Sequence, residues 1–135
     1  MLFRSSTPSS SVFGTHFTWS SDETTTGTTS TSFQRKTTLT ASDLPSGYYR
    51  LGWYFEWRIN STNTDILTRV VVDGSNVVME HNEEVKDVSS WHTTSGYAIT
   101  QLSAGGHSLG LDYGVESNGA TSYMRRARLE LWRVG

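Results

Sequence analysis

The sequence contains no cysteine, and its 135 residues carry a net charge of only −2 with a pI near 6.0. Without cysteine there is no disulfide bridge, no thiolate zinc site and no cysteine nucleophile, so the fold does not depend on the redox compartment. Without an excess of positive charge there is no field that would hold a phosphate backbone. We therefore expect no nucleic-acid partner.

A long apolar stretch is also missing from the sequence. The first four residues are followed at residues 5–11 by serine, threonine and proline, so we expect neither a signal peptide nor membrane insertion. This start predicts synthesis in a cytoplasm. At 15.0 kDa the chain has the length of one domain. We expect a single domain over residues 1–135, with residues 1–11 as a candidate flexible N-terminal arm.

Aromatic residues are plentiful in a chain that has few other apolar residues. They make up 12% of the sequence and include five tryptophans, whereas all hydrophobic residues together make up 35%. A core made of a few large side chains suits two packed sheets. No segment sustains the apolar spacing of a helix, whereas several segments alternate with period two between turn residues.

Residues 48–60 alternate most clearly. The odd positions are aromatic or aliphatic: Tyr49, Leu51, Trp53, Phe55, Trp57 and Ile59. The even positions include Arg50, Glu56 and Arg58, and a shift of one residue would bury these charges. We therefore expect the odd positions to face the core.

The same alternation predicts further strands, at residues 12–19, 32–40, 66–72, 77–80, 97–102, 107–113 and 123–134. Phe13, Phe17 and Trp19 share one phase of the first of these strands. In the last strand one phase is apolar (Ala127, Leu129, Leu131) and the other is mixed (Met124, Arg126, Arg128, Glu130). Residues 20–31, which are rich in serine, threonine and glycine, are predicted to form a long loop.

About eight strands without a crossover helix predict an all-β fold. We expect an antiparallel β-sandwich, a jelly roll of about eight strands. An immunoglobulin-like sandwich is the main alternative, although the chain lacks the Cys-Trp-Cys pattern of that fold.

No residue spacing in the chain is typical of a catalytic centre. Residues 80–87 are rich in acids but lack the Asp-x-Asp-x-Asp-Gly framework of a calcium loop. The four histidines are not spaced as zinc ligands, no serine lies in a Gly-x-Ser-x-Gly turn, and no carboxylate pair is marked out. We expect a protein that is not an enzyme and has no catalytic residue, cofactor or metal.

Two groups of side chains are candidates for an interface or a ligand platform. Residues 124–128 hold three arginines, which would divide between the two faces of a strand and pair with acids such as Glu56, Glu80 or Glu130. Binding of an anionic sugar is the alternative. Aromatic side chains outside the core phase suit stacking on sugars or a subunit contact, and we favour the contact. The candidates are Tyr48, Tyr54, Trp91, Arg126, Arg128 and Trp132.

Five segments, at residues 44–51, 53–57, 69–73, 79–81 and 125–134, resemble a family of small phage virion structural proteins. The members are capsid-decoration or fibre-head modules of mostly uncharacterised role. The segments are strand and turn patterns, so the resemblance carries over no functional residue. Residues before Ser32 have no counterpart, and form either an attachment arm or the first strand of the sandwich.

The resemblance implies a jelly-roll subunit of a phage particle that acts through protein–protein contacts, either in capsid decoration or in a tail fibre. It implies a homo-oligomer, a trimer, whose partners are other virion proteins, and it places the protein in the virion after synthesis in the host cytoplasm. The alternative function is a carbohydrate-binding or host-receptor-binding module that contacts a glycan of the host surface.

Overall fold

The computed structural model describes residues 12–135, so the predicted arm at residues 1–11 lies outside the described residues. The described chain forms nine strands: β1 (Thr18–Asp22), β2 (Thr26–Thr28), β3 (Gln34–Leu44), β4 (Gly47–Ile59), β5 (Ile66–Val72), β6 (Asn76–Glu83), β7 (His92–Leu102), β8 (Gly105–Val115) and β9 (Ser122–Arg133). Within that part of the chain no helix is long and apolar enough to cross a membrane.

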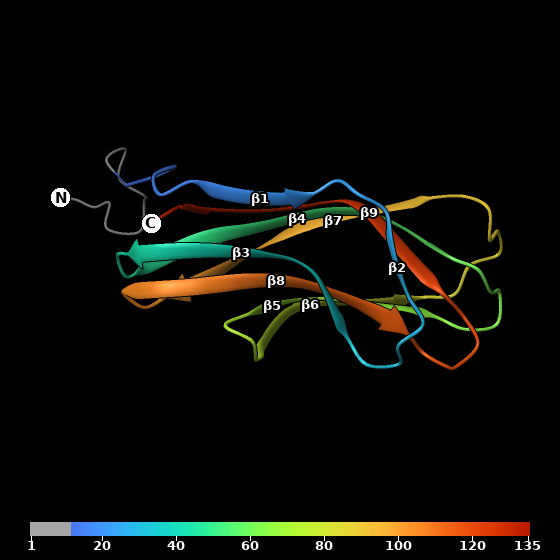
Figure 1. Cartoon of the computed structure of the whole chain (residues 1–135). Coiled ribbons are helices and arrows are strands. Elements are labelled where there is room, and N and C mark those ends of the chain that lie inside the picture. Colours follow the sequence, from blue (N-terminus) through green and yellow to red (C-terminus); the bar gives the residue numbers. More distant parts are fainter. Residues whose placement is uncertain (1–11) are drawn as a thin grey trace.

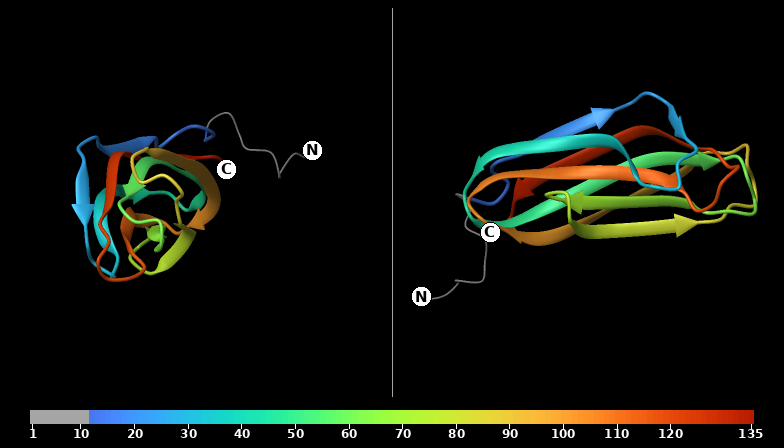
Figure 2. Two further views of the ribbon diagram at one scale, coloured as in Figure 1. Left: turned by 90° about the vertical axis from the view of Figure 1, so that its right-hand side faces the viewer. Right: turned by 60° about the horizontal axis from the view of Figure 1, so that its bottom comes forward.

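The strands form two antiparallel sheets packed face to face (Figure 1). Sheet A has the order β1-β9-β4-β7, and sheet B has the order β3-β8-β5-β6. Strands β1 and β2 both pair with β9, one after the other, and act as a single interrupted edge strand. The sandwich therefore has eight strand positions, divided between the sheets in the order of a jelly roll. The predicted fold is confirmed, and the two sheets enclose an elongated core (Figure 2).

Strand β4 supplies the largest side chains of the core. Tyr49, Leu51, Phe55, Trp57 and Ile59 are each at most 1% exposed, which confirms the predicted phase of this strand. Trp53 shares that phase but is only half-buried and packs against the rim of the core. The inward residues of β5 and β8 cover these side chains from sheet B.

The prediction of a loop at residues 20–31 is wrong, because this segment contains most of β1 and all of β2. An edge strand is held by backbone hydrogen bonds to one neighbour and does not need an apolar face. The break between β1 and β2 is held by Lys36, whose buried ammonium lies 2.7 Å from the carbonyl oxygen of Thr24 and 3.1 Å from the carboxylate of Asp22.

The predicted phase of the last strand is wrong at its beginning, because β9 contains a β-bulge. Tyr54 pairs with Arg128 and Glu56 pairs with Arg125, so β9 has one residue more than β4 over this interval. Arg126 adopts a φ of 50°, in the left-handed region. The extra residue reverses the alternation, so Met124 faces the core together with Ala127, both fully buried.

Candidate functional site

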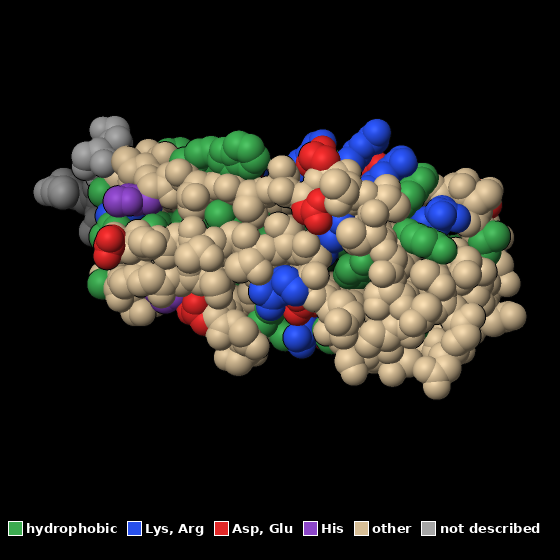
Figure 3. Space-filling model, viewed as in Figure 1, with side chains coloured by type: hydrophobic (Ala, Val, Ile, Leu, Met, Phe, Trp, Pro, Cys, Tyr) green, Lys and Arg blue, Asp and Glu red, His purple; other side chains and the backbone are tan. Residues whose placement is uncertain are grey.

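The outer face of sheet A carries a row of four residues that are neighbours in the strand register. Trp19 of β1 pairs with Glu130 of β9, Glu130 pairs with Gly52 of β4, and Gly52 pairs with Tyr97 of β7. The two aromatic ends of the row are 62% and 55% exposed. In the space-filling view, hydrophobic side chains gather over β1, and charged side chains gather farther along the same edge (Figure 3).

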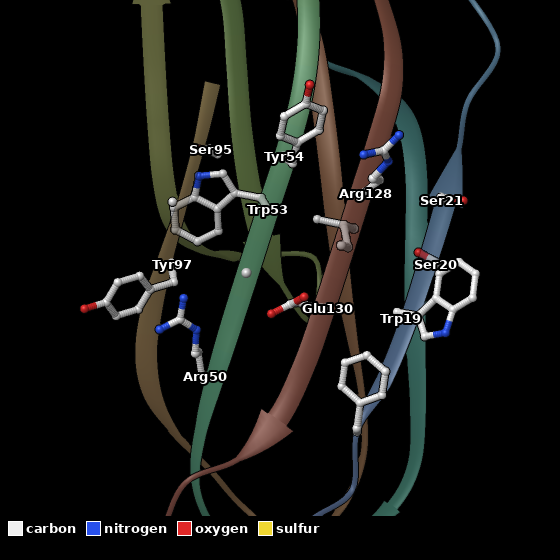
Figure 4. A pocket seen from close by; sticks show the side chains of 14 residues that line it. Trp19, Ser20, Ser21, Arg50, Trp53, Tyr54, Ser95, Tyr97, Arg128 and Glu130 are labelled. Carbon is white, nitrogen blue, oxygen red and sulfur yellow. The ribbon is translucent and has the colours of Figure 1, made fainter. Parts of the chain in front are cut away.

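This row crosses an open cleft with a volume of about 670 Å³, a size typical of ligand sites. Figure 4 shows Trp19 on one side, Tyr97 on the other and Glu130 between them. The cleft is lined by residues of four strands and of the segment before β1: Phe17, Trp19, Ser20, Ser21, Arg50, Gly52, Trp53, Tyr54, Ser95, Gly96, Tyr97, Arg128, Leu129 and Glu130.

The floor of the cleft depends on the glycine in the middle of β4. A Cβ atom at Gly52 would lie 2.8 Å from Cγ of Glu130. Because the glycine has no side chain, the side chain of Glu130 lies over the backbone of β4. The carboxylate is thereby held between the two exposed rings and not above them.

Two charged groups in the cleft are free of ion pairs. The guanidinium of Arg50 lies 3.8 Å from the ring centre of Tyr97 and 5.9 Å from that of Trp132, and within the described part of the chain its Nε atom has no hydrogen-bond partner. An oxygen of Glu130 accepts a long hydrogen bond of 3.4 Å from Nε1 of Trp132. Among residues 12–135, neither group has an opposite charge within 4.0 Å. The cleft therefore offers an uncommitted cation and an uncommitted anion.

Beyond the cleft, the same face ends in a group of arginines around Glu56. The carboxylate accepts hydrogen bonds from the hydroxyl of Tyr54 at 2.6 Å, from Nε of Arg125 at 2.8 Å and from Nη1 of Arg126 at 3.2 Å. The hydrogen bond from Tyr54, followed by those from the two arginines, lowers the pKa of Glu56 to about 2. Arg128 instead pairs with Glu23 at 2.7 Å.

The bulge changes the predicted distribution of the arginines. We expected them to divide between two faces, but Arg125 and Arg126 both donate to Glu56 on the outer face. Of the acids that we expected as partners, Glu56 is confirmed. Glu80 lies on β6 in sheet B, and Glu130 lies on β9 itself without a salt bridge in the described chain.

The structure distributes the six predicted candidates over the whole outer face of sheet A. Tyr54 and Arg128 line the cleft. Trp132 borders the cleft and packs edge-on against Phe13, with 5.3 Å between ring centres. The remaining three lie outside the cleft: Tyr48 is exposed near the start of β4, Arg126 holds Glu56, and Trp91 lies against Arg125.

Four residues that line the cleft were not among the six candidates: Phe17, Trp19, Tyr97 and Glu130. Phe17 and Trp19 share one phase of the predicted strand at residues 12–19, together with Phe13, and all three are more than half exposed. They lie in or next to an edge strand whose outward side chains no other layer covers. No sequence pattern indicated that Tyr97 and Glu130 belong to one site, because only the strand register places them in one row.

Residues 12–135 contain no group of three or more histidine and acidic side chains that could hold a metal ion. Two of the four histidines pair with an acid instead. Nε2 of His81 lies 2.8 Å from Glu83, and Nδ1 of His107 lies 2.7 Å from Asp73.

The sequence matches no protein-family model and no curated protein. It is similar in structure to part of dimeric latent PorU from Porphyromonas gingivalis, with a TM-score of 0.54, 9% identity and coverage of 91% of this chain and 13% of that one. It is also similar to a chain of infectious bursal disease virus, Gt strain, with a TM-score of 0.49 and 10% identity; the match covers 90% of this chain and 33% of the viral chain. A third similar structure is the CBM36-1 domain of a multidomain xylanase from the hindgut metagenome of Trinervitermes trinervoides. The TM-score is 0.47 and the identity is 10%, and the match covers 88% of this chain and 98% of that domain.

These similarities concern the fold. The chain spans much less than two thirds of the PorU chain and of the viral chain. At 9% identity, the match to PorU shows that the same arrangement of strands occurs within a much longer protein. Jelly rolls serve as lectin domains and as capsid domains alike, so the fold does not decide the function.

Proposed function

We propose that the protein is a carbohydrate-binding module and that the cleft on the outer face of sheet A holds the sugar. The observation that carries this proposal is the row Trp19–Glu130–Gly52–Tyr97, in which two exposed rings flank a carboxylate that has no salt bridge within residues 12–135. A sugar presents apolar C–H faces and a rim of hydroxyl groups. Aromatic rings suit the faces, and a carboxylate between them suits the hydroxyl groups.

The polar groups in the cleft favour a sugar over a protein partner. The core of a protein interface is depleted of acidic side chains, whereas this cleft has Glu130 between its two exposed rings, without an ion pair in the described chain. Ser21 and Ser95 add hydroxyl groups on its two sides. A ligand that both donates and accepts hydrogen bonds over its whole length uses these groups, and a carbohydrate is such a ligand.

The spacing of the rings favours an oligosaccharide over a single sugar. Trp19 and Tyr97 lie on strands that are three positions apart in sheet A, and adjacent strands are separated by about 4.8 Å, so their backbones lie about 14 Å apart. One sugar ring does not contact both aromatic rings at that distance. A short chain laid across the strands contacts both.

The proposal is tested by screening the purified chain against an array of neutral and acidic glycans, followed by titration of the strongest ligands. Trp19→Ala and Tyr97→Ala should each weaken binding, because each removes one exposed ring. Val77→Ala is the matched control, since Val77 is 43% exposed but lies on β6 in the other sheet. Absence of binding to every glycan, or equal binding by all three variants, contradicts the proposal.

A second candidate function is supported by exposed apolar side chains beyond the cleft. Phe13, Tyr48 and Ile99 are each about half exposed and lie at the same end of sheet A. An apolar surface of this kind also suits a contact between subunits. Such a contact would be needed in the trimeric virion protein that the resemblance implies. Light scattering behind size exclusion tests it. A trimer that Ile99→Asp converts to a monomer supports this role, and a monomeric wild-type protein opposes it.

A further inference from the structure

We propose that the glycan is acidic, and that the arginine end of the outer face binds one of its carboxylate or sulfate groups. This inference rests on the proposed carbohydrate-binding function. The arginine end consists of Arg58, Arg125 and Arg126, with the rings of Trp91 and Tyr123. It adjoins the cleft, because Tyr54 lines the cleft and donates its hydroxyl hydrogen to Glu56 among the arginines.

The arginine end carries more positive than negative charge. Three guanidinium groups lie there, and the carboxylate of Glu56 is the acid that pairs with Arg125 and Arg126. In the described chain Arg58 has no carboxylate within 4.0 Å, and its Nη1 atom donates a long hydrogen bond of 3.4 Å to the carbonyl oxygen of Val88. The low pKa of Glu56 means that this carboxylate is charged at neutral pH, so it offsets one of the three positive charges and two remain.

Most of the donors in this group are free. Among residues 12–135, Arg125 uses Nε for Glu56 and its two Nη atoms have no partner, and Arg126 uses only Nη1. The side chains of Arg125 and Arg126 are 28% and 50% exposed, so ligands can reach these donors. A guanidinium presents its hydrogens in a planar fork that matches the oxygens of a carboxylate or sulfate.

The guanidinium groups are held in place before a ligand arrives. Arg125 lies 4.1 Å from the ring centre of Trp91, and Arg58 lies 4.5 Å from that of Tyr123 and 5.4 Å from that of Trp91. A side chain that is already ordered loses less conformational entropy when it binds an anion. These cation–π contacts therefore favour binding at the arginine end.

The backbone gives an independent reason to assign a function to this end. Arg126 has a φ of 50°, a conformation that is costly for a residue with a side chain and that accumulates at binding sites. In a regular strand, Arg125 and Arg126 would point to opposite faces. The bulge with its left-handed residue instead brings both to Glu56, so the strain serves to gather positive charge on one face.

The distance along the sheet fits one chain that contacts both parts. Gly52 in the cleft and Arg58 in the arginine end are six residues apart on β4, which corresponds to about 20 Å along an extended strand. An oligosaccharide that crosses the row from Trp19 to Tyr97 and then continues along β4 passes Tyr54 before it reaches the arginines. The cleft then binds the sugar rings, and the arginine end selects for acidic groups.

The experiment compares glycans that share a backbone and differ in charge, such as polygalacturonate with its methyl ester and dextran sulfate with dextran. We expect binding to the acidic member of each bound pair to be at least tenfold tighter. Arg58→Gln should remove most of this preference and should weaken binding of the neutral member by less than twofold. Arg126→Gly should do the same while thermal stability is kept or raised, because glycine accepts the left-handed backbone.

The outcomes separate this inference from the function on which it rests. The inference is overturned if neutral glycans bind as tightly as acidic ones and if Arg58→Gln binds acidic glycans as tightly as the wild type does. The carbohydrate-binding function would remain intact in that case. Absence of binding to any glycan overturns both. Inorganic sulfate is titrated alone as a further arm: if it saturates the arginine end and does not compete with the acidic glycan, the glycan does not use this end, and the inference fails.

Discussion

Removal of the buried carboxylate on the outer face of sheet B tests whether burial decides the strength of ion pairs in this fold. Asp112 is 3% exposed and lies between two arginines of neighbouring strands. Its oxygens accept hydrogen bonds from Nε of Arg35 and from Nε of Arg69, the latter at 2.9 Å. The variant Asp112→Ala leaves both guanidinium groups without a counter-ion.

The expected loss follows from the number of contacts and from their exposure. Hydrogen bonds to charged groups contribute about 1.5–3 kcal/mol each. The side chains of Arg35 and Arg69 are 41% and 29% exposed and regain contacts with water, so the total is reduced. We expect the free energy of unfolding to fall by about 2–3 kcal/mol, which lowers Tm by about 8 °C for a domain of this size.

The measurement is chemical denaturation at pH 7, together with a thermal scan, on wild type, Asp112→Ala and the control Glu23→Ala. Glu23 also pairs with an arginine, Arg128, but both side chains are about half exposed, so its loss should change stability much less. Equal effects of the two substitutions, or no effect of Asp112→Ala, would refute the argument from burial.

Three further outcomes are expected. Trp19→Ala should raise the Kd for a bound oligosaccharide about 30-fold, as measured by titration. A sugar over one face of the exposed indole buries about 75 Å² of apolar surface, which contributes about 2 kcal/mol to binding. An unchanged Kd contradicts this role of Trp19. Gly52→Ala should weaken binding in the same titration, because the new Cβ would lie 2.8 Å from Cγ of Glu130 and would force that side chain away from its position between the two rings. The hydrogen bond to Asp73, followed by that to Ser103, raises the pKa of His107 above 6.5. Protonated His107 should therefore stabilise the fold fully below pH 6.5, and this stabilisation should be lost as the pH rises through the raised pKa. His107→Gln should remove this pH dependence of stability.

Most of the fold follows from the alternation of side chains. The predicted strand at residues 66–72 coincides with β5, and the buried phase of β4 is right except that Trp53 lies at the rim. Residues 20–31 were misassigned, because an edge strand of serine and threonine leaves no apolar pattern to detect. Strand β7 begins at His92, five residues before the predicted start at Tyr97, for the same reason.

The candidate site depends on features that the sequence does not reveal. Trp19 and Tyr97 are separated by most of the chain and become ends of one row only through the register of β1, β9, β4 and β7. The bulge at Arg126 gathers the arginines on one face, and it depends on a single extra residue in β9. Tyr54 and Arg128 face outward as expected, because alternation is regular along β4 and in the part of β9 that follows the bulge.

The most direct test of the account is to map a bound glycan onto the chain by NMR, using the strongest ligand from the array. We expect shifts of backbone amides in β1, β9, β4 and β7 around Trp19, Gly52 and Tyr97, and of the indole N–H of Trp19, with no shifts in β5 and β6. Shifts confined to the loops or to sheet B would contradict a glycan site on the outer face of sheet A.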